Sequence, residues 1–513
     1  MRNLFRTNIL GALVTGALLT TSCSDYLDKM PENQLPVDEV DYTITSNAYK
    51  PVMGIYHLTG QKLTAWATLG MMAVRGDDTE KGGIANDQID YSYFHNFNYS
   101  TATNFWGNNN TWVAFYNVII SSNLALGSLD KYAQYASSET DRIVIEGYKY
   151  EVRFQRAYAY LLLSRMYGSV PVFTDNSSSD AYIKKPYKEV IDFIVSEAEA
   201  CAEGLAAVHP ANMKHKGAAS RYSALALKAV AAAELCDYPT VLEATTPIIE
   251  EGKFDLHPDY YALFNMGGEY SQENLFEIQF SFFGQESGDQ FRADNFFEFQ
   301  GPGAGAYFKS AKKFGEGNRD NMGGGWGFLP VNKKLSDLMI ARGEGIRYTT
   351  TVIKTTGMTD AEGKEFNITP SNDTIYAGNP GTPTEYNGKA YTPSIELIRN
   401  QYGGDKNIIV FRYADILLLD AEAKVKQGMN GDESFNKVRR RAGMPELTNV
   451  TFEQVMEERY VELGCEFGTR YYDLVRTGLA KTELSAQGEG YTEAKRFYPI
   501  PQAQIDLNPN LGL

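Results

Sequence analysis

Apolar residues recur at helical spacing through two long parts of the chain. In 112–126, Trp112, Phe115 and Ile119 fall on one helical face. The same spacing, bounded by glycine, proline or a capping serine, predicts further helices at 142–167, 187–205, 220–235, 239–252, 411–427, 433–442 and 452–476. We therefore expect a mostly α-helical protein.

The predicted helices come in pairs joined by short turns. Their spacing of roughly 30–45 residues favours a tetratricopeptide-like helical-repeat scaffold. The strict repeat consensus is absent, so the pattern alone leaves this architecture open.

Helical periodicity fades between about 254 and 407. Glycine clusters stand at 301–305 and 323–327, Thr, Asn and Pro dominate 349–393, and 275–283 is β-prone. This stretch is too long for one structureless loop in a compact domain. We expect a long irregular insertion of loops and small hairpins, where binding residues are often found.

The N-terminus has the features of a lipoprotein leader. Arg2 and Arg6 precede a short apolar core and small residues, and Cys23 follows. We interpret 1–22 as a signal peptide, Cys23 as the lipidated residue, and 23–40 as that cysteine with an extended acidic tether. An ordinary signal peptide with a chance cysteine is the alternative. No later segment is expected to cross a membrane.

The charge balance excludes one class of partner. The 513 residues contain 48 Lys and Arg against 64 Asp and Glu, a net charge of −16. Nucleic-acid binding requires basic patches for phosphates, so we expect no such partner, whereas neutral sugars are indifferent to this charge. Cys201, Cys236 and Cys465 cannot form a paired disulfide framework and are expected as buried thiols.

Catalytic and metal motifs are missing from the sequence. The five His are scattered, and no nucleophile elbow or phosphate-binding loop appears. We expect no catalytic residue, no cofactor and no metal. Asp77, Asp78 and Glu80 form the best local carboxylate cluster, which keeps a glycoside hydrolase as an alternative.

Four C-terminal segments carry a family resemblance. In order they are FRYADILLLDAEAKVKQG (411–428), FNKVRRRAGMPEL (435–447), EERYVELGCEFGTRYYDLVRTG (457–478) and RFYPIPQAQIDLNPNL (496–511). The chain resembles the SusD/RagB family. The resemblance implies a non-catalytic, surface-exposed lipoprotein of the cell outer membrane, which binds an oligosaccharide and delivers it to a TonB-dependent SusC-like transporter.

The resemblance also implies a division of the chain. Residues 41–260 would form the N-terminal helical part, 261–407 the insertion that sets ligand specificity, and 408–513 the C-terminal helical part. Glu458, Glu462, Glu466 and Arg470 stand at successive i,i+4 steps on one predicted helix, and Arg412 and Asp415 resemble a scaffold pair. We expect structural roles for all six.

Two tryptophans are the leading candidates for ligand contact. Trp106 lies among Asn, Ser, Thr and Gly just before a predicted helix, and Trp326 is flanked by glycines in the insertion. Exposed aromatic rings suit the flat apolar faces of sugars. In the family this pre-helix loop contributes to the glycan site. Trp66 and Trp112 lie in apolar segments and are expected to be structural.

The polar candidates come from two places. Arg75, Asp77 and Asp78 lie in AVRGDDTEKGG (73–83), which resembles a family segment that supplies polar ligand contacts, and Asn109 stands near Trp106. Three functions remain open: a glycan-binding lipoprotein, a peptide- or protein-binding helical-repeat lipoprotein, and a surface hydrolase. Exposed tryptophans on one groove would favour glycan, whereas a groove lined by Asn without rings would favour peptide.

Overall fold

The structure is a computed structural model of the chain. It describes residues 40–102, 104–177, 182–280, 296–312, 321–322, 325–397 and 406–512. The predicted leader, Cys23 and nearly all of the tether lie outside these ranges, so their assignment stays a prediction.

Helices dominate both ends of the described chain. The N-terminal part contains η2 (Thr45–Asn47), α3 (Lys50–Leu63), α4 (Trp66–Ala73), α5 (Asp90–His95), α6 (Trp106–Gln134), α7 (Glu139–Tyr167), α8 (Tyr187–Gly204), η4 (Pro210–Asn212), α9 (Arg221–Ala233) and α10 (Tyr238–Glu250). The C-terminal part contains α15 (Tyr413–Lys426), α16 (Asp432–Arg441), α17 (Phe452–Leu463), α18 (Thr469–Arg476), α19 (Ala480–Glu483), η7 (Glu493–Lys495), α20 (Gln502–Leu507) and η8 (Pro509–Gly512).

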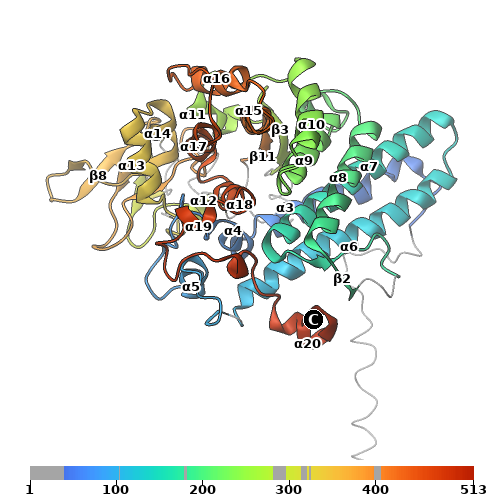
Figure 1. Ribbon diagram of the computed structural model, residues 1–513, viewed down its shortest axis with the longest axis horizontal. Helices are drawn as coiled ribbons and strands as arrows, with labels where there is room; N and C mark the ends of the chain where they lie inside the picture. The colour runs from blue at the N-terminus through green and yellow to red at the C-terminus, as the bar shows by residue number, and fades with distance from the viewer. Residues whose placement is uncertain are drawn as a thin grey trace, which may run out of the picture.

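Successive helices pack side by side as a repeat scaffold. Each helix from α7 to α10 packs against the one before it, α15 packs against α10, and α16 and α17 pack against α15 (Figure 1). The mostly helical, tetratricopeptide-like fold is confirmed. The long insertion therefore begins and ends between two neighbouring helices, α10 and α15.

Local sequence signals set the ends of these helices. Ser138 caps α7, and Gly168 ends it with a left-handed φ of 71°. Ser220 forms a capping box at the start of α9, as Thr451 does with Gln454 at α17.

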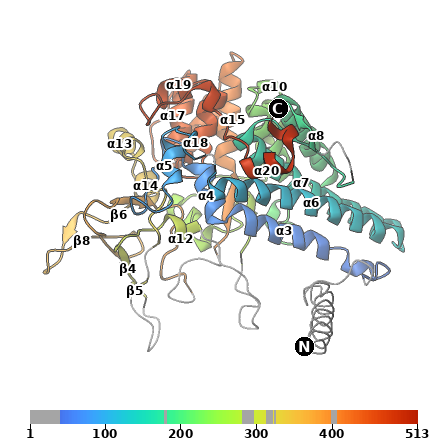
Figure 2. The same cartoon turned by 90° about the horizontal axis from the view of Figure 1, so that it is seen from below.

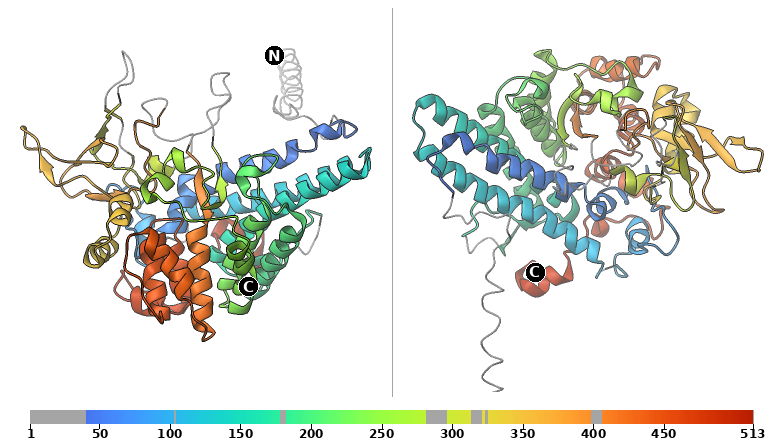
Figure 3. Two further views of the ribbon diagram at one scale, coloured as in Figure 1. Left: turned by 90° about the horizontal axis from the view of Figure 1, so that it is seen from above. Right: turned by 180° about the vertical axis from the view of Figure 1, so that it is seen from behind.

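The helix α6 is longer than its apolar pattern predicted. It starts at Trp106, six residues before the predicted start at Trp112. By length and composition alone it could cross a membrane, contrary to expectation, but half of its most apolar window is buried. It packs along α3, α4 and α7, and Figures 2 and 3 show α3 beside α6 and α7. Packing within the fold accounts for its apolar residues.

The insertion contains the short strands and hairpins that were predicted, and small helices in addition. Its elements are α11 (Tyr260–Leu263), η5 (Met266–Gly268), β3 (Asn274–Ile278), α12 (Phe296–Gln300), β4 (Tyr307–Lys309), β5 (Asn321–Met322), α13 (Lys333–Arg342), α14 (Ile346–Thr351), β6 (Val352–Lys354), β7 (Met358–Thr359), β8 (Glu365–Ile368), β9 (Thr374–Tyr376), β10 (Glu385–Asn387) and β11 (Ile408–Arg412). One small sheet, from β1 (Val170–Pro171) and β2 (Lys184–Lys185), lies outside it.

All described strand pairs are antiparallel. The largest sheet has the order β5-β4-β9-β8-β7, and β10 pairs with β6. The strand β3, near the start of the insertion, pairs with β11 at its end. This pair brings the two ends of the insertion together beside the helical scaffold. The helices α13 and α14 were not predicted.

The predicted helix 452–476 is two helices. The first, α17, ends at Leu463, and α18 begins at Thr469 after Gly468 adopts a φ of 71°. A Cβ at Gly468 would stand 2.2 Å from the carbonyl oxygen of Met72, so only glycine fits there. The expected ladder from Glu458 to Arg470 on one helix is therefore wrong, although these residues are structural.

The acidic residues of α17 instead hold a buried ion network. The Glu462 carboxylate accepts from Arg412 at 2.6 Å, from Arg347 at 3.1 Å and from Arg441. Glu458 binds Arg347 at 2.6 Å. Burial alone would raise the pKa of Glu462, but Arg441, Arg412 and Arg347 lower it to about 2. The network joins the insertion, through Arg347, to the C-terminal helices.

Glu462→Gln should destabilise the fold strongly. The substitution removes the charge that compensates three buried arginines, so we expect a loss of about 3–5 kcal/mol in the free energy of unfolding. Chemical denaturation measures it. Asp337→Asn in the exposed Lys333–Asp337 pair is the matched control and should change stability by about 0.5 kcal/mol or less. Equal effects of the two substitutions would contradict the role of the network.

The same carboxylate should make stability depend on acid pH. Its folded-state pKa of about 2 lies below the ordinary 4.5, so its stabilisation is present above about pH 4.5 and is lost as pH falls toward 2. The shift corresponds to about 3 kcal/mol. Denaturation at a series of pH values should show a shallower decline for Glu462→Gln than for the unchanged protein. Parallel curves would contradict the low pKa.

Candidate functional site

Three tryptophans from three separate segments meet at the surface. The ring of Trp66 lies 5.0 Å from that of Trp106 and 5.8 Å from that of Trp326, in edge-to-face geometry both times. Trp106 and Trp326 are 44% and 38% exposed, whereas Trp66, which contacts both, is partly buried. The two predicted rings therefore belong to one aromatic cluster, which we call the tryptophan cluster.

Trp106 is projected by the start of α6. It is the first residue of the helix, not part of a preceding loop, and the buried ring of Phe105 anchors the turn before it. A Cβ at Gly107 would stand 2.4 Å from the Phe105 ring, so the glycine permits this packing. One helical stripe then continues from Trp106 through Asn110, Val113 and Asn117.

Trp326 is held by close backbone packing within the insertion. Its amide donates to the carbonyl of Glu298 at 2.7 Å, and the amide of Gly327 donates to Gly301 at 2.8 Å. A Cβ at Gly303 would stand 2.5 Å from the carbonyl carbon of Trp326. The glycine-rich segment 301–305 therefore lets a second backbone approach and fixes the position of this ring.

A groove of about 680 Å³ runs beside the cluster, and we call it the tryptophan groove. It is lined by the end of α3, the start of α4 with Trp66, the α6 stripe and Phe280. Within the described part of the chain, the side-chain amides of Gln61, Asn110 and Asn117 have no hydrogen-bond partner, so they are available to a ligand. Aromatic rings flanked by open amides suit a neutral ligand with flat apolar faces and hydroxyl groups.

Sequence reasoning missed Trp66 as a candidate. Its apolar neighbours suggested a core position, and the residues after it are indeed buried in α4. Trp66 itself is the first residue of that helix, where its ring faces the groove. The expected structural role of Trp112 agrees with its 3% exposure and its edge-to-face contact with Tyr167.

Arg75 is not a surface residue. Its side chain is fully buried, and its guanidinium lies 4.0 Å from the centre of the Tyr471 ring and 3.7 Å from that of Tyr498. It also donates to the carbonyl of Arg496 at 2.9 Å. Arg75 therefore ties the segment after α4 to the C-terminal residues, which corrects its assignment as a ligand contact.

Asp77 and Asp78 are also buried by protein partners. Asp77 accepts from Arg470 at 2.7 Å and pairs with Lys334 at 2.5 Å; burial acts to raise its pKa, but these two cations lower it. Asp78 accepts from the amide of Cys465 at 2.8 Å, and burial raises its pKa to about 6. Neither carboxyl reaches a ligand at the surface, so the hydrolase alternative loses its best carboxylate pair.

Asn109 points away from the groove. It is half-buried, and its side-chain oxygen accepts from Gln504 of α20 at 2.8 Å. One residue further on, a helix turns by about 100°, so the side chain of Asn110 lines the groove in its place. The sequence placed Asn109 in a loop before the helix, whereas it lies in the first turn of α6, where helical periodicity turns its side chain away from the groove.

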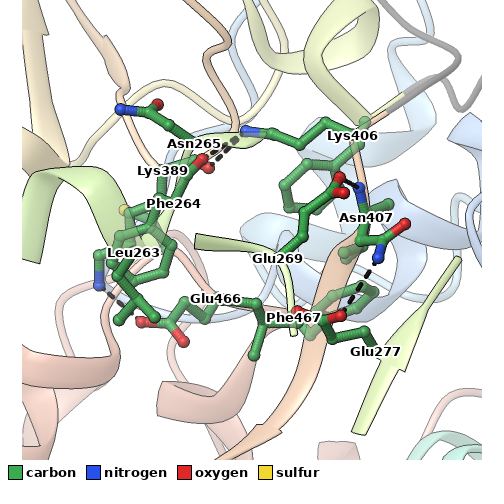
Figure 4. A pocket seen from close by; sticks show the side chains of 14 residues that line it. Leu263, Phe264, Asn265, Glu269, Glu277, Lys389, Lys406, Asn407, Glu466 and Phe467 are labelled. Atoms are coloured by element: carbon green, nitrogen blue, oxygen red, sulfur yellow. Dashed lines mark hydrogen bonds and ion pairs between the residues drawn. The ribbon is translucent and has the colours of Figure 1, made fainter. Parts of the chain in front are cut away.

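A second cavity near the insertion is too small for such a ligand. Its volume is about 30 Å³, enough for a water molecule. It is lined by paired groups, among them Lys389, which contacts Glu466 at 2.8 Å, and Asn407, which donates to Glu277 at 3.1 Å (Figure 4). These polar and charged groups are paired with one another, so this cavity is part of the folded core.

Known proteins are similar to this chain in sequence. The C-terminal part, 272–512, matches the family model described as "SusD family", and 25–230 matches one described as "Starch-binding associating with outer membrane". The chain belongs to the SusD/RagB family. Among curated relatives, the SusD-like protein P38 of Formosa agariphila is 27% identical over 435 residues, which cover 78% of each chain.

Solved structures of SusD-like proteins have the same fold. The surface glycan-binding protein A from Bacteroides thetaiotaomicron, solved in complex with laminarihexaose, superposes with a TM-score of 0.72 at 21% identity and covers 91% of this chain and 98% of its own. A laminarin-binding SusD-like protein superposes with a TM-score of 0.74 at 20% identity, over 90% and 97% of the two chains. At these identities the likeness establishes the fold.

Asp77→Asn should weaken the fold without changing ligand affinity. The change leaves the buried Arg470 with only the more distant Glu483, at 3.7 Å, as an anionic partner, and we expect a loss of about 3 kcal/mol in the free energy of unfolding. Asp87→Asn, at a nearby exposed carboxylate, is the control. Denaturation measures stability, and calorimetric titration measures glycan affinity. A stable variant with lost affinity would show that Asp77 contacts the ligand after all.

Proposed function

We propose that this protein is a non-catalytic glycan-binding lipoprotein of the cell surface, which captures an oligosaccharide at the tryptophan groove. The observation that carries the proposal is the tryptophan cluster: Trp106 and Trp326, from distant segments, are both exposed and both contact Trp66. Sugar rings stack on such surfaces through their apolar faces. Two solved proteins of the same fold, one in complex with laminarihexaose and one that binds laminarin, support the same class of ligand.

The alternatives fit the groove less well. A peptide site was expected to be lined by Asn and backbone donors without rings, whereas this groove combines Asn110 and Asn117 with two tryptophans. A hydrolase requires two carboxyl groups that face the substrate. The described residues that line the groove include no Asp or Glu.

The proposal includes an anchor and a partner. Lipidation of Cys23 would hold the protein on the outer membrane, and the match to a starch-binding family associated with that membrane supports this location. The captured oligosaccharide would pass to a TonB-dependent SusC-like transporter. The protein would close over the transporter as a rigid body, because the buried ion network joins the insertion to the helical scaffold.

The proposed division of the chain gives each part a role. Residues 41–260 would supply Trp66 and Trp106, and 261–407 would supply Trp326 and much of the ligand specificity. Residues 408–513 would complete the scaffold. The groove is lined by Trp66 and Trp106 from the first part and by Phe280 from the second, and Trp326 stands beside it against Trp66, so the ligand would bind across their boundary.

Trp106→Ala and Trp326→Ala should each weaken glycan binding. Each removes an exposed stacking surface. We expect a loss of about 1–2 kcal/mol in the free energy of binding, which is roughly a 5- to 30-fold loss of affinity. Calorimetric titration of the ectodomain that starts after Cys23, against a panel of plant, host and microbial glycans that includes laminarihexaose, measures this. Analysis of the same mixtures for shorter products tests the absence of turnover.

Tyr135→Ala provides the matched control. Tyr135 is another exposed aromatic residue, 54% accessible, at the opposite end of α6 from Trp106, and its loss should leave affinity unchanged. Binding that survives both tryptophan substitutions would place the ligand elsewhere. A folded protein that binds no glycan in the panel would contradict the proposed function, and product formation would favour the hydrolase.

A further inference from the structure

A second hollow adjoins the tryptophan groove. Its volume is about 390 Å³, within the range of small-molecule sites. It is lined by α3, by Gln155 of α7, by residues near His215 and by β3 with the residues that follow it. Gln61 and Phe280 line both the hollow and the groove, so the two spaces are neighbours along α3. We call this space the Gln155 hollow.

Buried polar atoms in this hollow have no partner in the described part of the chain. Gln155 is fully buried, yet neither the nitrogen nor the oxygen of its side-chain amide makes a hydrogen bond. The hydroxyl of Thr59, 1% exposed, and Nε2 of His215 are also unpaired. Leaving a buried donor or acceptor unpaired costs about 1–3 kcal/mol, so such atoms indicate a polar molecule that completes them.

The walls of the hollow are held in place. The hydroxyls of Tyr49 and Tyr56 each donate to Glu151 at 3.0 Å, one helical turn before Gln155 on α7. The Tyr49 ring in turn stacks on His215, with centroids 3.4 Å apart and planes within 9°. The unpaired atoms therefore lie in a fixed arrangement, and reorganisation to pair them with one another is restricted.

The chemistry of these atoms selects a neutral ligand. A carboxamide presents a donor and an acceptor side by side, and a hydroxyl acts as either, which matches neighbouring hydroxyl groups on a sugar ring. The nearby Glu277 carboxylate is already bound by the amide of Tyr270 at 3.0 Å and by Asn407 at 3.1 Å. A full charge on the ligand is therefore not required.

We infer that the Gln155 hollow is a second sugar subsite, which takes a further ring of the oligosaccharide bound at the tryptophan groove. The inference rests on the proposed glycan binding. It adds that the affinity depends on the length of the oligosaccharide. A short oligosaccharide fills the groove alone. A longer one extends past Gln61 and Phe280, and its next ring pairs with Gln155 and Thr59.

Gln155→Leu and Thr59→Val test this subsite. Both replace an unpaired polar group by an apolar group of similar size, so the fold should be as stable as before or more so. The probes are laminari-oligosaccharides from the disaccharide to laminarihexaose or, where the glycan panel selects another class, the same size series of that class. We expect the affinity for the longest members to fall about fivefold, as for the loss of one hydrogen bond, and that for the disaccharide to stay unchanged.

The outcomes separate this inference from the proposed function. Trp106→Ala should weaken every length, and a tryptophan fluorescence change with the disaccharide should persist in Gln155→Leu. If both hollow variants bind all lengths as the unchanged protein does, the hollow holds only water and the inference is wrong. Equal weakening at every length would also overturn it, because the hollow would not be a separate subsite. If the unchanged protein binds no glycan, the proposed function itself fails.

Discussion

The buried charge of Glu462 is the constraint on which the rest of the structure depends. Three arginines converge on it: Arg347 from α14, Arg412 from the end of β11 and Arg441 from α16. Removing one member of such a cluster leaves the others buried without compensation, so the segments that carry them are held together. A long insertion that is poor in regular structure thereby becomes a fixed part of the helical scaffold.

The proposed binding surface follows from that attachment. Trp66 and Trp106 begin helices of the scaffold, whereas Trp326 comes from the insertion, and their rings meet only because the insertion is fixed. Close glycine packing, as at Gly303, sets the last ring in position. Rings held in advance lose little conformational freedom when a ligand binds, which favours capture of a flexible glycan.

Local patterns predicted the fold better than the site. Helical periodicity identified the scaffold, and exposure in a glycine-rich context identified Trp326. The same local reasoning failed for Arg75 and Asp77, because their partners, Tyr498 and Arg470, lie some four hundred residues away along the chain. Trp66 was missed for the converse reason: its neighbours are buried, and only the tertiary arrangement leaves its own ring at the groove.

A crystal structure of the ectodomain with its bound oligosaccharide tests the central claim most directly. The account predicts sugar rings stacked against Trp106 and Trp326, with hydroxyl groups paired to the amides of Asn110 or Asn117. An oligosaccharide bound elsewhere, with the tryptophan groove empty, would contradict it.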